Sequence, residues 1–114
     1  MQVQYNARTA ENLHAGIAKA FNDAKGRYNL NMSEIAYGGI GAGEAARRKV
    51  WAMAMGGAYV MLNGMDIATT AKSDLEDCGR LARFFESADV SRMAPHDERA
   101  HADTQYVLAE PGSN

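Results

Sequence analysis

One short motif has the spacing of a phosphate-binding loop. Gly41, Gly43 and Ala46 fit the pattern G-x-G-x-x-A, after a predicted strand and at the start of a predicted helix. In dinucleotide-binding folds such glycines let the backbone approach a pyrophosphate, and an acidic residue farther on, here Asp66, binds the ribose. Glu44 argues against this hypothesis, because it puts a negative charge where the pyrophosphate would bind. The alternative interpretation is a flexible loop whose glycines allow tight turns.

Histidine and cysteine, which often bind metals, form no strong motif. His96 and His101 lie among acidic residues, but their spacing matches no metal-binding pattern and favours a solvated charged segment. Cys78 is the single cysteine, which excludes an internal disulfide and a cysteine-rich zinc site. For His14 we expect a packed or half-exposed side chain on a helix. We therefore expect no metal, and we assign no cofactor.

Composition excludes several classes of protein. The 114 residues are 46% hydrophobic and 23% charged, which fits one ordinary globular domain at most. The formal net charge of -2 favours binding to neither nucleic acid nor an anionic membrane. The longest apolar run, 51–62, is shorter than the about 20 residues that a bilayer requires. The polar residues 1–6 show no signal peptide.

Three repeats of a strand followed by a helix occupy most of the chain. The predicted strands are 3–5, 28–35 and 58–62, and the predicted helices begin after Thr9, near Glu44 and at Ser73. A repeat of about 28 to 30 residues is typical of βα units in a barrel or a doubly wound sheet. Right-handed crossovers would put all three helices on one face of a parallel sheet, and little would cover the other face. We therefore predict the α/β fold class, with three consecutive βα units in residues 1–88.

Local signals define the ends and faces of the first elements. Thr9 is a candidate N-cap of the first helix, and Gly26 is a candidate left-handed residue after it. A pair of glycines, 56–57, ends the second helix. In the strand 28–35 one face carries Tyr28, Leu30 and Met32, and the other carries Asn29, Asn31 and Ser33. The apolar run 58–62 is typical of a strand buried on both faces.

The third helix has a capping-box signal, and a polar segment follows the helix. Ser73 and Glu76 can exchange side-chain hydrogen bonds with each other's backbone N–H groups. The residues of this helix that we expect to be buried are Leu75, Cys78, Ala82 and Phe85. Residues 89–114 are predicted to be a polar linker and a short β-forming tail, with one strand at 104–109. The few strands and the uncovered sheet face indicate a piece of a larger fold, or a subunit that completes its core with a partner.

Several segments resemble the last part of a (β/α)8 barrel of the apiosidase-like and endoglucanase-like glycosidases. In that family an acidic residue closes the seventh strand, a helix with arginine and tryptophan follows, and a glycine pair precedes the eighth strand. The matching residues here are Glu34-Ile35-Ala36-Tyr37-Gly38-Gly39, Ala46-Arg47-Arg48-Lys49-Val50-Trp51-Ala52 and Gly56-Gly57-Ala58-Tyr59.

The later segments extend this resemblance to the end of the chain. Residues 81–87 and 92–95 are similar to the final barrel helix and the segment that leaves it. Residues 104–109 and 111–112 are similar to the opening of a β domain described as collagen-binding. The resemblance therefore covers residue 29 to the end, which corresponds to the last third of a family member.

The resemblance implies hydrolysis of a glycosidic bond by two carboxylates, with Glu34 as the nucleophile. A retaining glycosidase needs a second carboxyl about 5–5.5 Å away, and the family takes this acid from the fourth barrel strand, which has no counterpart here. Asp66 could face Glu34 across one strand spacing, or could be a turn residue. Tyr37 and Asn63 could line a sugar site, or could pack within loops. The expected function is glycan-directed, with catalysis incomplete or lost in this chain alone.

A non-enzymatic role is the second hypothesis. A short α/β module with an uncovered sheet face could complete its core as a homo-oligomer. Its methionines, concentrated at Met53, Met55, Met61 and Met65, suit an adaptable apolar surface as well as an ordinary core. We therefore expect association of the chain with itself, or with missing parts of a larger parent.

Overall fold

The computed structural model describes residues 2–3, 9–36, 41–63 and 66–110. Its larger elements are β1 (Gln2–Val3), α1 (Ala10–Ala24), β2 (Leu30–Ala36), α2 (Gly43–Met55), β3 (Ala58–Asn63), α3 (Lys72–Ser87), β4 (Ala94–Pro95) and β5 (Leu108–Ala109). Two short 3-10 helices, η2 (Val90–Arg92) and η3 (Asp97–Arg99), lie in the C-terminal segment. The predicted α/β class and the alternation of strands and helices are confirmed.

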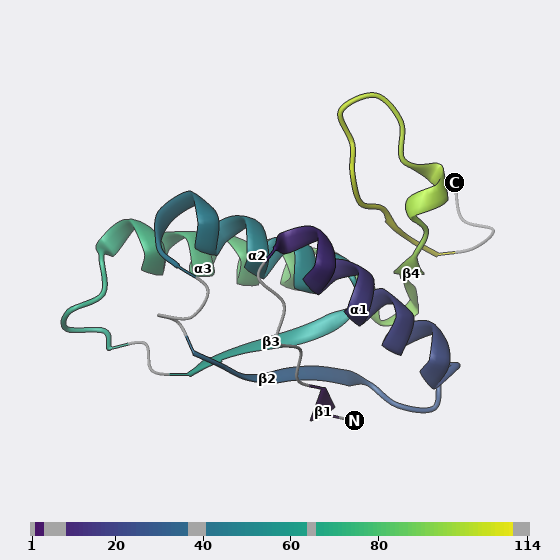
Figure 1. The fold of residues 1–114 in the computed structure, drawn as a ribbon, viewed down its shortest axis with the longest axis horizontal. Coiled ribbons are helices and arrows are strands. Elements are labelled where there is room, and N and C mark those ends of the chain that lie inside the picture. The colour runs from purple at the N-terminus through teal and green to yellow at the C-terminus, as the bar shows by residue number, and fades with distance from the viewer. Residues whose placement is uncertain (1, 4–8, 37–40, 64–65, 111–114) are drawn as a thin grey trace.

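The main sheet has three parallel strands in the order β1-β2-β3 (Figure 1). The helices α1, α2 and α3 lie on the same side of this sheet (Figure 1). Each crossover leads to the adjacent strand, as expected for consecutive right-handed βα units. Within the described ranges, one face of the sheet is therefore left without helices, and β3 forms an edge of the sheet.

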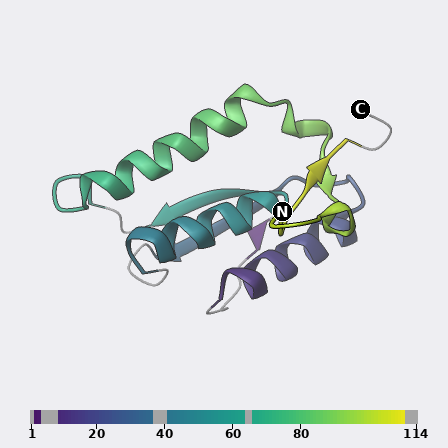
Figure 2. The ribbon, with the colours of Figure 1, turned by 90° about the horizontal axis from the view of Figure 1, so that it is seen from above.

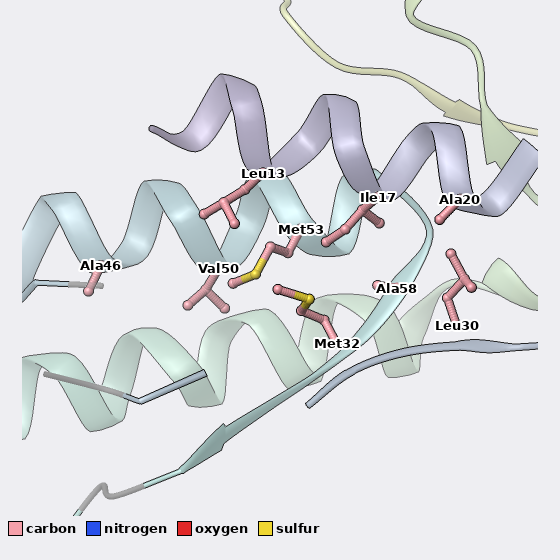
Figure 3. Packing of buried hydrophobic residues seen from close by; sticks show 9 residues of the cluster. All are labelled: Leu13, Ile17, Ala20, Leu30, Met32, Ala46, Val50, Met53 and Ala58. Atoms are coloured by element: carbon pink, nitrogen blue, oxygen red, sulfur yellow. The ribbon is translucent and has the colours of Figure 1, made fainter. Parts of the chain in front are cut away.

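The core lies between this sheet and the first two helices (Figure 3). Its buried residues are Leu13, Ile17, Ala20, Leu30, Met32, Ala46, Val50, Met53 and Ala58. In β2, Leu30 and Met32 point into the core and are at most 1% exposed, whereas Asn31 between them is half-buried. The alternation predicted for this strand is thus confirmed from Leu30 to Met32, because only one face of β2 meets the helices. Tyr28, predicted on the same face, lies before the strand and is 58% exposed.

The glycine pair after α2 lets α1 approach the start of β3. A Cβ atom at Gly56 would lie 2.8 Å from Cγ2 of Ile17, and a Cβ at Gly57 would overlap the ring of Phe21. Gly57 also has a φ of +97°, which a side chain would strain. The pair therefore does more than end the helix, since it permits close packing of α1 on this turn.

The predicted ends of α1 are confirmed in outline. The Thr9 hydroxyl accepts a hydrogen bond from the Asn12 backbone N–H at 3.1 Å. At the other end, Lys25 and Gly26 have φ values of 51° and 73°, so the helix ends through left-handed residues.

The capping box predicted at Ser73 is wrong. The helix α3 begins one residue earlier, at Lys72, and its N-cap is Ala71, which makes no side-chain cap hydrogen bond. The Asp74 carboxylate instead accepts a hydrogen bond from the backbone N–H of Gly43, at the start of α2. A contact between two helices has therefore replaced the local cap that the sequence pattern favours.

The expected burial of the apolar stripe on α3 is also wrong. Asp74 is the one buried residue of this helix, while Leu75, Cys78 and Phe85 are half-buried and Ala82 is exposed. Figure 2 shows the reason, because α3 stands apart from β3, beyond the edge of the sheet. The helix is held through α2, where Trp51 contacts the Phe84 and Phe85 rings at centroid distances of 5.2 and 5.9 Å.

The strand β3 is not buried on both faces. Ala58, Val60 and Leu62 face the helices and the core, whereas Tyr59 and Met61 are 59% and 52% exposed. Their exposure follows from the open face of the three-stranded sheet.

The C-terminal segment folds back against α1. β4 and β5 form a two-stranded antiparallel sheet, and β4 packs on α1. The strand predicted at 104–109 is reduced to Leu108–Ala109. The residues before it turn toward α1, where the Tyr106 ring stacks on His14.

Candidate functional site

The carboxyl ends of β2 and β3 form one rim of the parallel sheet. Ile35 pairs with Leu62, and Ala36 pairs with Asn63. Glu34 lies on β2, two residues before the strand ends. The backbone that carries Glu34 is therefore next to the last residues of β3. The side chains of Glu34 and Asn63, and the whole of Tyr37, lie outside the described residues.

Asp66 is an exposed residue in the turn that precedes α3. Its Oδ1 accepts a hydrogen bond from the backbone N–H of Ala68 at 2.9 Å, and its carbonyl accepts from Thr70 at 2.8 Å. This is the local pattern of an Asx turn. The structure therefore gives Asp66 the turn role that sequence analysis left open beside a catalytic one.

The glycine-rich loop leads into the N-terminus of α2, where a carboxylate of the chain itself is bound. Gly41 and Gly43 have φ values of 87° and 59°. The backbone N–H of Gly43 donates to Oδ1 of Asp74 at 3.1 Å, and Asp74 is 7% exposed. A negative charge is favourable at a helix N-terminus, and Asp74 supplies one at the Gly43 N–H. This contact favours the structural interpretation of the loop over a dinucleotide site.

Beside this contact, α2 and α3 enclose a small space with a volume of about 20 Å³. This volume suits a single water molecule and no larger ligand. Cys78 lines it together with Asp74 and Asp77. Burial raises the pKa of the Cys78 thiol, and the nearby carboxylates of Asp74 and Asp77 raise it further. Cys78 is therefore a poor nucleophile at neutral pH.

A much larger groove, with a volume of about 360 Å³, separates α3 from the edge strand β3. Its walls come from β3 (Val60, Leu62), from α3 (Leu81, Ala82, Phe85) and from the C-terminal segment (Met93, Leu108). None of the described residues that line this groove carries a charged side chain. It can therefore accept apolar groups, and it offers no charged side chain for a phosphate; Tyr28, Asn29, Tyr59 and Ser91 are the polar residues among its described lining.

The structure also reveals a buried cluster around His14 that sequence analysis missed. His14 is 3% exposed, and its Nδ1 donates to the carbonyl oxygen of Ala52 at 2.8 Å. Its Nε2 makes a short hydrogen bond with Oδ2 of Asp97. The Tyr106 ring stacks on the His14 ring, with the two ring centroids 3.8 Å apart. The other oxygen of Asp97 accepts from the Val107 backbone N–H at 3.0 Å. Both ring nitrogens are thus occupied within the protein.

This cluster contains a histidine and a carboxylate, as an acid–base pair does, but its geometry is that of a structural contact between α1 and the C-terminal segment. No ring nitrogen of His14 is left for a substrate, and the covering Tyr106 ring closes access. The pKa of Tyr106 is raised, first by burial and then by the negative charges of Glu11 and Asp97. A histidine within an apolar helix face was the one available signal, since its partner Asp97 is 83 residues away.

Neither a metal site nor a membrane helix is found in the part of the chain that the structure describes. No group of three or more histidine, cysteine, aspartate or glutamate residues in this part is arranged to hold a metal ion. None of the described helices combines the length and the apolar character needed to cross a bilayer.

No protein-family model, curated protein or solved structure matches this chain significantly. The functional argument therefore depends on the residues and on their arrangement in this fold. The resemblance to glycosidase barrels enters below as part of a proposal.

Proposed function

We propose that this chain is a glycan-directed part of a (β/α)8-type barrel, with a catalytic pair that is incomplete in the chain alone. The observation that carries this proposal is the parallel pairing of β2 with β3 as far as Ala36 and Asn63. In α/β folds, ligands bind at the carboxyl ends of the strands. The segment with Glu34 and the segment with Asn63 and Asp66 belong to neighbouring strand ends of this kind.

In this proposal Glu34 is the nucleophile of a retaining glycosidase, and Tyr37, Asn63 and Asp66 contact the sugar. The acid that protonates the leaving group must lie about 5–5.5 Å from the nucleophile. Asp66 is engaged in its own turn, so it is a weak candidate for this acid. The acid would then come from another strand of a completed barrel.

An activated substrate allows the nucleophile to be tested even though the acid is missing from this chain. In a 2,4-dinitrophenyl 2-deoxy-2-fluoroglycoside, the leaving group departs as a stable phenolate and needs no proton. The Glu34 carboxylate would attack C1, and the bond from C1 to the phenolate oxygen would break with its electron pair. The product is a glycosyl ester on Glu34, which intact-mass spectrometry and peptide mapping detect.

We expect slow labelling of Glu34 by the glucosyl, xylosyl or arabinosyl reagent, and no turnover of the corresponding methyl glycosides. The variant Glu34→Gln should not be labelled, whereas the control Glu44→Gln, at an exposed residue of α2, should be labelled like the native chain. Absence of labelling by all three reagents, or labelling that survives Glu34→Gln, would overturn the proposed nucleophile.

A second function, as an interaction module, is favoured by the exposed apolar side chains of β3. Tyr59 and Met61 lie on the sheet face without helices and are 59% and 52% exposed. Association through this face would bury apolar surface, and each Å² of buried apolar surface would stabilise the complex by about 25 cal/mol. Sedimentation velocity at micromolar concentration should then show a dimer, and Tyr59→Lys should dissociate it. A native chain that sediments as a monomer would reject this function.

A further inference from the structure

We propose that the groove between α3 and β3 binds an extended apolar strand from another polypeptide. This strand would pair with the free backbone edge of β3, and its side chains would fill the groove. The proposal is an alternative to completion of a barrel, because both would pair a strand with the same edge of β3. It rests on the edge strand, on the position of α3 and on the groove lining.

The edge of β3 is the first part of the argument. Among the described residues, β3 pairs with β2 and with no other strand. The backbone N–H and C=O groups on its other side therefore face the groove without a strand partner. An unpaired edge of this kind is a template for a further strand. Its six residues span roughly 20 Å, at about 3.3 Å per residue.

The position of α3 is the second part. In consecutive βα units each helix packs over its own strand and over the next strand of the sheet. α3 lies in the helix layer but beyond β3, over a position where this sheet has no strand (Figure 2). The chain then leaves through η2 into the pair β4–β5, which belongs to a separate sheet. α3 is thus placed to cover a fourth strand that the described chain does not supply.

The groove lining gives the chemistry of the occupant. Val60 and Leu62 on the strand and Leu81, Ala82 and Phe85 on the helix line the groove, and no charged side chain is among its described lining residues, most of which are apolar. A strand whose inward positions are valine, isoleucine or leucine would bury these side chains without leaving a charge unpaired. Met93 and Leu108 contribute to the end of the groove near the C-terminal segment.

A second copy of this chain fits the groove less well than a single strand. Strands in a sheet are about 4.8 Å apart, whereas a helix is about 10 Å wide, so one helix covers two strands. Two copies joined through their β3 edges would bring both α3 helices over the same pair of strands. A strand that brings no helix to this face avoids the overlap.

A labelled peptide tests the proposal directly. The probe is a fluorescein-labelled peptide of about seven residues that alternates valine with threonine between flanking lysines, and the native 114-residue chain is the receptor. We expect saturable binding by fluorescence anisotropy. We also expect slower hydrogen exchange at β3 amides, which distinguishes strand pairing from general hydrophobic contact. A peptide with proline at its centre has no backbone N–H to donate to β3 at that position and should bind weakly.

Two variants of α3 provide the matched control. Ala82→Phe fills the groove, whereas Arg83→Phe puts the same side chain at an exposed neighbour that does not line it. Ala82→Phe should weaken binding by roughly tenfold or more, and Arg83→Phe should not. Equal binding by both variants, or no binding to the native chain, would overturn the proposal. Self-association of the native chain that Ala82→Phe abolishes would assign the groove to a second copy instead, and would also overturn it.

Discussion

His14 on the first helix and Asp97 near the C-terminus are joined by a short hydrogen bond although 83 residues separate them. Asp97 also accepts from the Val107 backbone N–H, so one side chain connects α1 to η3 and to the residue that precedes β5. The segment is thereby part of the folded unit, although its composition resembles a solvated linker. The prediction of a polar linker and a short β-forming tail at residues 89–114 does not include this anchor.

Removal of the Asp97 carboxylate should destabilise the protein and release the C-terminal segment. Asp97→Ala leaves the buried His14 Nε2 and the Val107 N–H without their partner, which costs about 1–3 kcal/mol. Urea denaturation should show this loss, and limited proteolysis should cut within residues 89–110 first. The control is Glu98→Gln, which alters an exposed ion pair with His96 and should change stability by less than about 1 kcal/mol. Equal effects of both substitutions would contradict the anchoring role.

The contact between Asp74 and Gly43 should position α3 on α2. Asp74→Ala removes the acceptor for the Gly43 N–H and should cost about 1–3 kcal/mol. Asp74→Asn retains an acceptor oxygen but removes the favourable charge at the helix N-terminus, so its cost should be smaller. Thermal unfolding of both variants measures which of the two substitutions destabilises the protein more. A fully stable Asp74→Ala protein would show that other contacts with α2, such as the Trp51 aromatic contacts and the Arg47–Asp77 ion pair, are enough to hold α3.

Alanine substitutions at two glycines with positive φ, Gly43 and Gly57, distinguish the cost of backbone strain from the cost of close packing. Gly43→Ala should cost about 1 kcal/mol, because a Cβ there meets nothing within 4 Å but the φ of +59° is unfavourable. Gly57→Ala adds a collision with the Phe21 ring and should cost about 1–3 kcal/mol more. Denaturation midpoints of the two variants provide the comparison. If the two substitutions cost the same, α1 would not pack on the Gly57 turn as closely as described.

Cys78 should react slowly with thiol reagents, and its reactivity should rise only at high pH. Burial and the carboxylates of Asp74 and Asp77 raise the pKa of the thiol, so less thiolate is present at a given pH than in the unfolded chain. The rate of reaction with a disulfide reagent rises with pH as thiolate forms. The midpoint of this rise should therefore lie at a higher pH in the native chain than in the chain in denaturant. Asp77→Asn should move the profile toward lower pH. A native profile that coincides with the denatured one would contradict this environment.

Local patterns in the sequence predict most of the secondary structure. Thr9 caps α1, the alternation around Leu30 and Met32 identifies the inner face of β2, and the glycines at 56–57 separate α2 from β3. These features depend on residues within a few positions of one another, and the parallel order of the strands follows from the repeat of the βα units.

The errors come from contacts between residues far apart in the chain. Ser73 fits a local cap, but α3 is set by the hydrogen bond of Asp74 to Gly43, which lies 31 residues away. The apolar stripe of α3 indicates burial, yet the described chain provides no strand beneath it. His14 has a partner that no periodicity connects to it. For the candidate site, the sequence predicts that Glu34 lies near a strand end, which is confirmed, while its chemical role stays a prediction.

The most direct test of the glycan-directed proposal is an NMR titration of the isotopically labelled chain with methyl glucoside, methyl xyloside and methyl arabinoside. The account predicts chemical-shift changes for at least one sugar, concentrated at the carboxyl ends of β2 and β3 and lost in Glu34→Ala. Absence of any change at millimolar sugar, or changes confined to the groove beside α3, would contradict it.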